Sequence, residues 1–374
     1  MNKKEVAEIR KRIKPESGCI KKIKPYFVTP EKRCLSLNTD RFPLMTNEEQ
    51  EHYCKVFKSV LSGKEGKKLH SMDILPDAET STDGVQRLLL AIRDSELSES
   101  EEMEKYIQII MDSYISENPY FILFLHGNYD VPAKASDDTV VEDSQELYDF
   151  IICCICPTKL SKTGLAYNAG DDEIKELVSS YIIPSPSFGF LFPAFNDRSA
   201  DIHSTLVYTN KLNPEYEPMF SRVLGCKFPL SEDDQLEAFS KLADSAFGGS
   251  CGFTEAVNVQ SSLNEMLQDH SVSGKDGPLA VGCQEIASVF TDNYATDMDS
   301  FEETYAELMG DETLLVENLV QPKNTTISTD SFKITMPVEN LHLISVREID
   351  GIKYLVLKPN DSNIQLNGVS TNCE

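Results

Sequence analysis

Hydrophobic and polar positions recur with different periods along the 374-residue chain, and each change of period predicts a structural element. Short apolar runs bounded by turn residues are typical of buried strands. Such runs predict strands at about 120–126, 147–155, 187–193 and 201–209. The run at 147–155 is apolar almost throughout, so we expect both faces of this strand to be buried.

Apolar residues at helical spacing predict a second set of elements. Capping boxes, in which Ser or Thr is followed three residues later by Glu, mark helix starts at Thr46, at Ser98 (with Ser100 as the alternative cap) and at Ser300. A basic N-terminal helix is expected to end before Pro15. The predicted helices cover 2–14, 47–62, 85–92, 101–115, 171–180, 232–245, 256–267 and 284–290, and one more begins at Ser300.

Turn residues divide the segments that remain. Residues 19–37 predict a hairpin, and residues 132–145 predict an acidic loop. Short strands are predicted near the C-terminus, where Asp350-Gly351 is a strong signal for a tight hairpin turn. These strands cover about 331–335, 341–347, 354–357 and 364–366.

Together these elements predict an α+β fold in three parts, because the chain is longer than one hydrophobic core usually serves. Residues 1–228 are expected to form a mixed α/β domain with a basic N-terminal arm. A helical region at 229–312 and a small β-rich C-terminal unit at 313–374 complete the predicted organisation.

Charge is distributed unevenly over a chain whose formal net charge is -26. Residues 1–33 hold eleven Lys or Arg against four Glu, so this segment carries +7 and the rest of the chain −33. The total argues against a protein that wraps nucleic acid over its whole surface. The basic segment predicts either an arm that docks on an anionic partner or one that folds back on the acidic body.

The ten cysteines lack the regular spacing of a disulfide framework. On a strand, Cys154 and Cys156 share one face and Cys153 lies on the other, which favours packed, reduced thiols over a soft-metal or redox site. No apolar stretch follows the basic N-terminus as in a signal peptide, and no run of eighteen apolar residues is present. We therefore expect a cytoplasmic protein.

Two polar clusters follow apolar runs and are the places where chemistry is most plausible. Ligands collect at strand ends in open α/β sheets, so both clusters are candidate sites. The first cluster, after 120–125, contains His126, Asn128, Tyr129 and Asp130. The second, after 188–195, contains Asn196, Asp197, Arg198, Asp201 and His203.

Two interpretations of these clusters stay open. In one, a divalent metal binds between them and Arg198 holds a phosphate oxygen, which gives a metal-dependent hydrolase of a phosphorylated small molecule or nucleotide. The metal ligands would be His126, Asp130, Asp197, Asp201 and His203. In the other, Asp197 and Arg198 form an ion pair at a turn and the histidines are ordinary hydrogen-bonded side chains. No known metal-site signature is present, so we favour the second interpretation.

The basic segment gives the main functional hypothesis. Its lysines lie beside Tyr26 and Phe27, and lysines next to aromatic rings suit phosphate contacts and base stacking in RNA. We therefore expect a non-enzymatic binding or regulatory protein that uses no cofactor and docks on RNA, a ribosome or an acidic protein surface. The candidate partner-binding residues are Lys11, Arg12, Lys14, Lys21, Lys22 and Lys24.

Four segments carry a family resemblance. They are the opening M-N-K-K-E-V-A-E-I-R-K, then I-C-P-T-K-L-S-K-T-G-L-A-Y-N, F-L-F-P-A-F-N-D-R-S-A-D-I-H-S and E-I-D-G-I-K-Y-L. With them the chain, from Met1 to about Val369, resembles a clostridial family known as domain of unknown function 4317. The resemblance implies a cytoplasmic protein of gut Firmicutes and supplies no catalytic residues to carry over.

Overall fold

The computed structural model describes the chain in two compact units, Met1–Ser231 and Glu232–Glu374. The described residues are those of 1–374 other than 39–41, 82–83, 135–139, 162, 169–171, 178, 274–276, 294, 296, 321–323, 359–363, 367–368 and 372–374. The fold is of the α+β class, as predicted.

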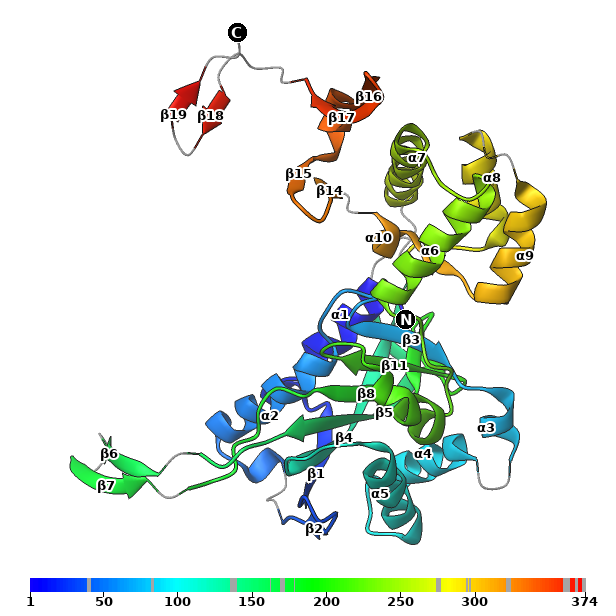
Figure 1. The fold of residues 1–374 in the computed structure, drawn as a ribbon. Coiled ribbons are helices and arrows are strands. Elements are labelled where there is room, and N and C mark those ends of the chain that lie inside the picture. Colours follow the sequence, from blue (N-terminus) through cyan, green and yellow to red (C-terminus); the bar gives the residue numbers. More distant parts are fainter. Residues whose placement is uncertain are drawn as a thin grey trace. The chain divides into compact units, whose positions relative to one another are not determined.

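A seven-stranded antiparallel sheet forms the centre of the first unit (Figure 1). Its strand order is β2-β1-β4-β5-β8-β11-β3, so the N-terminal strand β1 lies inside the sheet, between β2 and β4. The strands are β1 (Ile20–Val28), β2 (Cys34–Ser36), β3 (Leu69–Asp73), β4 (Tyr120–Lys134), β5 (Val140–Pro157), β8 (Phe188–Phe192) and β11 (Ser204–Thr209). The predicted hairpin at 19–37 is confirmed as β1 and β2.

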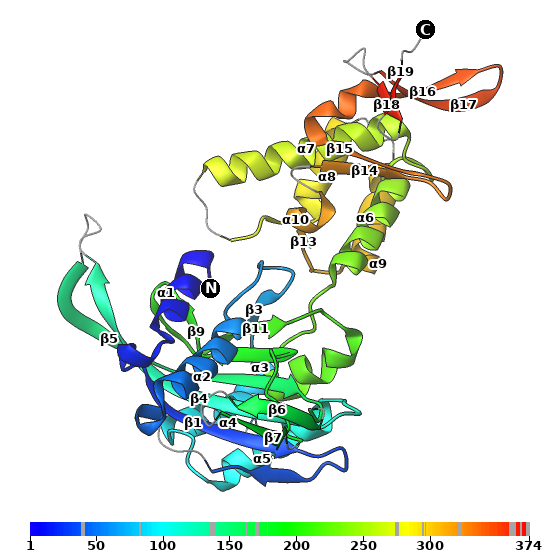
Figure 2. The same ribbon diagram turned by 90° about the vertical axis from the view of Figure 1, so that its left-hand side faces the viewer.

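Helices cover both faces of this sheet. One face carries α1 (Lys3–Arg12) and α2 (Asn47–Val60), and Figure 2 looks onto it. The opposite face carries α4 (Val85–Asp94), α5 (Glu101–Ser113) and the short helix η4 (Met219–Leu224). The sheet therefore separates two hydrophobic cores, and a side chain's position in a strand decides which core it joins.

Strand β5 shows this division most clearly. Residues 150–156 are all buried, which confirms the expected burial of both faces for most of the predicted strand at 147–155, although Leu147 at its start is 53% exposed. Cys153 packs toward α4 and α5, whereas Cys154 and Cys156 pack toward α1 and α2. Burial raises the pKa of Cys156 to about 12, so these cysteines are uncharged packing residues, as predicted.

The predicted helix starts are confirmed where a side chain caps the helix. Thr46 accepts a hydrogen bond from the Glu49 amide at 3.3 Å, and the Glu49 carboxylate accepts one from the Thr46 amide at 2.9 Å. Ser100, the alternative cap, accepts from the Met103 amide and begins α5. The helix start predicted at Ser300 is wrong, because α9 (Met298–Leu308) begins two residues earlier.

Two other predictions are wrong. The segment expected to be a helix at 171–180 instead contributes β7 (Glu173–Leu177), which pairs with β6 (Gly164–Asn168). Its apolar residues Ile174, Leu177 and Val178 follow a helical period, and the pairing with β6 overrides this local pattern. The acidic loop expected at 132–145 is also shorter, because β4 and β5 continue their ladder as far as Lys134 and Val140. Residues 135–139 lie outside the described part.

The second unit begins with helices and continues with hairpins. Its helices are α6 (Glu232–Ala246), α7 (Phe253–Val272), α8 (Cys283–Asp292) and α9, followed by the short α10 (Val316–Leu319). Phe290 packs edge-on against Phe301 at a centroid distance of 5.5 Å in their common core.

Strand β12 (Ala280–Val281) pairs with β13 (Leu314–Leu315), which follows α8 and α9 in the sequence. Three short hairpins come next, and they pair β14 (Asn324–Ser328) with β15 (Lys333–Pro337), β16 (Ile344–Ile349) with β17 (Ile352–Leu357), and β18 (Ile364–Leu366) with β19 (Val369–Thr371). Asp350 and Gly351 both have positive φ between β16 and β17, which confirms the predicted turn. In the part of the chain that is described, no helix has the length and apolar character needed to cross a membrane.

Gly189 on β8 allows α2 to approach the sheet closely. A Cβ at this position would lie 2.6 Å from Val60 and 2.7 Å from the Cys153 carbonyl oxygen. We predict that Gly189→Ala lowers the free energy of unfolding by about 1–3 kcal/mol, because the core must shift to admit the methyl group. Gly164→Ala is the matched control, since no atom lies within 4 Å of its new Cβ. Equal urea midpoints for the two variants would contradict this packing.

Candidate functional site

The first predicted cluster lies within strand β4 and not at a turn. His126 is 1% exposed, and its Nε2 lies 2.8 Å from the Asp149 carboxylate on β5. Arg93 of α4 lies 3.9 Å from the other oxygen of Asp149. His126 therefore belongs to the face covered by α4 and α5, while Asp130 is exposed farther along the strand.

The second cluster forms a tight hairpin between β9 (Ala194–Asn196) and β10 (Ser199–Asp201). Asp197 and Arg198 are the two turn residues, with φ of 50° and 63°, as a two-residue hairpin of this type requires. The Asp201 carboxylate accepts hydrogen bonds from Asn196 at 2.7 Å and from Ser204 at 2.5 Å. Burial alone would raise the pKa of Asp201, but these bonds outweigh it and hold that pKa below its ordinary value.

The structure does not bring the predicted metal ligands together. His203 is exposed and lies 2.8 Å from Glu79 of α3 (Pro76–Thr80), whereas His126 is buried and paired with Asp149 of β5. Among the described residues, no group of three His, Cys, Asp or Glu is placed to hold a metal ion. The expected ion pair between Asp197 and Arg198 does not form either, because Arg198 turns toward α1.

Arg198 and Tyr129 join the two predicted clusters through the N-terminal helix. The Arg198 guanidinium donates to the Glu8 carboxylate at 2.5 Å and to the Pro132 carbonyl at 2.9 Å. Tyr129 donates to the other oxygen of Glu8 at 2.8 Å and accepts from Arg12 at 3.0 Å. The Arg12 guanidinium also lies 4.3 Å above the Tyr129 ring. These bonds fasten the hairpin of Arg198 and strand β4 to α1.

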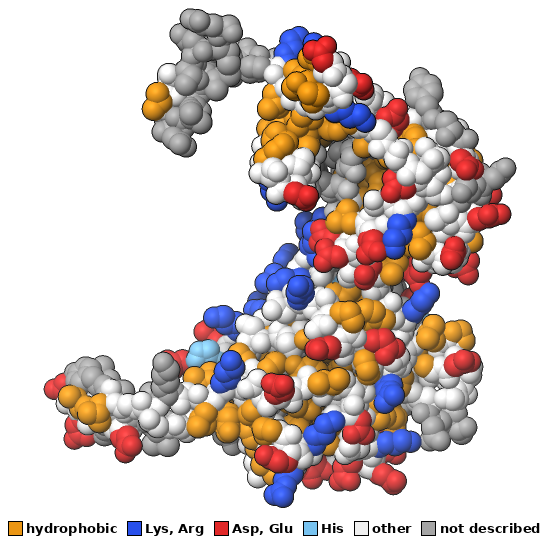
Figure 3. All heavy atoms as spheres, in the orientation of Figure 1, with side chains coloured by type: hydrophobic (Ala, Val, Ile, Leu, Met, Phe, Trp, Pro, Cys, Tyr) orange, Lys and Arg blue, Asp and Glu red, His pale blue; other side chains and the backbone are white. Residues whose placement is uncertain are grey.

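Basic side chains gather around this junction (Figure 3). They come from α1 and the turn after it, from the second half of α2, and from the β9–β10 hairpin. We call them the basic surface: Lys4, Arg10, Lys11, Arg12, Lys14, Lys55, Lys58 and Arg198. Six of them form no ion pair with any carboxylate of the described chain: Arg10, Lys11, Arg12, Lys14, Lys55 and Lys58.

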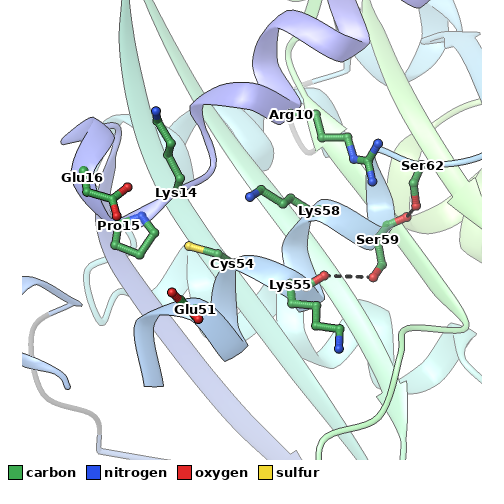
Figure 4. Close-up of a pocket in the computed structure, with 10 residues that line it drawn as sticks. All are labelled: Arg10, Lys14, Pro15, Glu16, Glu51, Cys54, Lys55, Lys58, Ser59 and Ser62. Carbon is green, nitrogen blue, oxygen red and sulfur yellow. Dashed lines mark hydrogen bonds between the residues drawn. The ribbon is translucent and has the colours of Figure 1, made fainter. Parts of the chain in front are cut away.

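The basic surface contains two hollows. The α1–β4 hollow has a volume of about 500 Å³ and lies beside Tyr129 and Arg198. The α1–α2 recess has a volume of about 590 Å³ and lies between α1, the turn at Pro15 and the second half of α2 (Figure 4). Lys14 lines both hollows, so they are neighbours on one continuous cationic surface.

The family of the chain follows from a match that covers nearly all of it. The model of the family described as "Domain of unknown function (DUF4317)" matches residues 1–369. The chain belongs to the DUF4317 family. A search of curated proteins found no match. The F-N-D-R segment of this DUF4317 chain is the hairpin that carries Arg198, so its place in the fold is beside α1.

The basic residues predicted to form one arm lie on different surfaces of this DUF4317 chain. Lys11, Arg12 and Lys14 belong to the basic surface. Residues 22 and 24 of β1 instead share a face with Tyr26, which packs in the core beneath α5. Lys24 pairs with Glu99 at 2.5 Å and its side chain is only 13% exposed, while Lys21 is exposed on β1 next to a bulge.

Sequence reasoning missed Lys55, Lys58 and Arg198 as companions of the α1 cations. The capping box at Thr46 predicted α2, and a helical period places Lys55 and Lys58 on neighbouring positions of its surface. No sequence signal placed α2 beside α1, because each helix takes its position from packing on the sheet, whose strands are distant from it in the sequence.

The backbone at Asp197 supplies a first test of the DUF4317 hairpin. Asp197 is exposed and has positive φ, so we predict that Asp197→Ala lowers the free energy of unfolding by about 1 kcal/mol through backbone strain. Asp197→Gly should equal or exceed the wild-type protein in stability, since glycine adopts this conformation freely. Urea denaturation measures both, and equal losses for Ala and Gly would show that the carboxylate itself is needed.

His203 supplies a pH-dependent test. Its hydrogen bond to Glu79 and the charge of that carboxylate raise the pKa of His203 above the ordinary value of 6.5. Protonated His203 therefore adds stability below the unfolded-state pKa, and this contribution is lost as the pH rises through the folded-state pKa. We expect Glu79→Gln to lower the His203 pKa in an NMR titration. An unchanged titration curve would contradict the pairing.

Proposed function

We propose that this protein is a non-enzymatic RNA-binding protein that holds the phosphate backbone of RNA on its basic surface. One observation carries the proposal: eight Lys and Arg side chains from three separate segments gather around α1, and six of them form no ion pair with a described carboxylate. Cations gathered without partners repel one another, and a bound polyanion relieves that repulsion.

The acidic remainder of the chain supports a confined contact. The formal net charge is -26, so a polyanion is repelled by most of the protein and attracted only where cations concentrate. Glu8, Glu16 and Glu51 are the carboxylates that line the two hollows, and Glu8 is already engaged by Arg198. The basic surface thus keeps a local excess of positive charge.

The aromatic residues of the site favour phosphate contacts over base recognition. Tyr129 is 6% exposed and lies beneath the Arg12 guanidinium, so its ring is not free to stack on a base. Contacts to phosphate position RNA without reading its sequence. We therefore propose binding that depends on charge and shape and varies little with base sequence.

The cysteines support a cytoplasmic location within this proposal. The nine described cysteines are free, and six of them are buried. Unpaired thiols in such number suit a reducing compartment, where RNA is abundant.

Matched triple variants test the proposal. Lys11→Gln, Lys14→Gln and Lys58→Gln together remove three cations of the basic surface, while Lys21→Gln, Lys22→Gln and Lys24→Gln remove the same charge from β1. We predict that the first variant makes the plot of log affinity against log salt concentration less steep by about 2. Each lost phosphate contact reduces the magnitude of this slope by roughly 0.7 for single-stranded RNA. The β1 variant should keep nearly the wild-type slope. Fluorescence anisotropy with labelled single-stranded RNA measures both.

Two outcomes would count against the proposal. If both triple variants lose affinity equally, net charge and not the basic surface governs binding. If the wild-type protein shows no salt-dependent RNA binding, yet an acidic polypeptide such as polyglutamate binds in the same assay, the partner is an acidic protein surface.

A further inference from the structure

We propose that the α1–α2 recess binds an oligophosphate, a short chain of directly linked phosphate groups. Such a chain is carried by the triphosphorylated 5′ end of RNA and by free nucleotides. The RNA source rests on the proposed function above, whereas the oligophosphate site itself does not.

The cations of the recess come from α1, from the turn that follows it and from α2 (Figure 4). Arg10 and Lys58 extend into the space between α1 and α2, Lys14 lies at the rim, and Lys55 turns away from the others. The volume of about 590 Å³ falls within the range of small-ligand sites.

The spacing of these cations is fixed by the core beneath them. Ile9 and Ile13 are fully buried next to Arg10 and Lys14, and Phe57 is fully buried next to Lys58. Both helices are therefore anchored to the same face of the sheet, and a ligand need not order the backbone that presents the charges. Preorganisation of this kind lowers the entropic cost of binding.

Charge density distinguishes an oligophosphate from an ordinary stretch of RNA backbone. Each phosphodiester of RNA carries one negative charge and is separated from the next by a ribose. An oligophosphate concentrates several charges in a short span, which matches cations that converge on one recess. Glu16 and Glu51 also line the recess, but neither forms an ion pair with its cations.

The remaining lining groups indicate that the recess recognises phosphate and not the nucleoside. Ser59 donates to the Lys55 carbonyl at 2.9 Å, and Ser62 donates to the Ser59 carbonyl at 2.7 Å, so both hydroxyl protons are used within the helix. The residues lining the recess include no aromatic ring on which a base would stack. Tripolyphosphate, ATP and GTP should therefore bind with similar affinity.

The test compares RNAs of one sequence that end in a 5′-triphosphate or a 5′-hydroxyl, together with tripolyphosphate, ATP and GTP as free ligands. We expect the full-length protein to bind the triphosphorylated RNA about tenfold more tightly than the hydroxyl form, as one added multi-charged contact predicts. The double variant Arg10→Gln/Lys58→Gln should lose this preference. Lys21→Gln/Lys22→Gln removes the same charge from β1, outside the basic surface, and should keep it. Circular dichroism melting confirms that both variants fold.

Each outcome decides the inference separately from the proposed function. Binding of tripolyphosphate that depends on Arg10 and Lys58 supports the site, and if RNA ends are not distinguished, the free nucleotide is its source. If tripolyphosphate does not bind, and the triphosphorylated RNA binds no more tightly than the hydroxyl RNA, the oligophosphate site is overturned even though RNA binding persists. The same holds if the Arg10/Lys58 variant binds oligophosphate as the wild type does.

Discussion

Val6, Ile9 and Ile13 bury one side of the N-terminal helix against the central sheet, and the arrangement of the basic surface depends on this contact. Each buried isoleucine contributes roughly 1.5–3 kcal/mol from area removed from water. With that side buried, Arg10, Lys11 and Arg12 face solvent, because the helical period places them on the other sides of the helix. The basic segment 1–33, which carries +7, is thereby held against the folded domain by its buried apolar side chains.

The same contact links the rest of the site. Because α1 lies on the sheet, Glu8 meets Arg198 and Tyr129, and Arg12 covers the Tyr129 ring. Strand β1 follows α1 and enters the sheet beside β4, so the helix is tied to the core at both its apolar side and its C-terminal end. The α2 cations complete the surface because α2 packs on the same face, where Gly189 leaves room for Val60.

Local sequence signals predicted the elements well and the site only in part. Capping boxes, apolar runs and turn residues predicted α2, α5 and every strand of the sheet except β3, since these signals act within a few residues. The segment at 171–180 was assigned wrongly because its pairing partner β6 decides its conformation. The lysines of residues 1–33 looked like one arm, but register with β4 sends Lys24 to the face opposite α1. Arg198 bonds to Glu8 of α1 although 190 positions separate the two residues in the sequence, and no local pattern indicates such a contact.

Amide hydrogen exchange of residues 3–28, measured by mass spectrometry at low and high salt, tests most directly whether the basic segment is anchored by apolar burial. An anchored α1 and β1 should be protected to the same degree as β4 and β5, and salt should change this little because burial is not screened. Rapid exchange of α1 at high salt, with β4 and β5 still protected, would show instead that a mobile arm is held only by its charge.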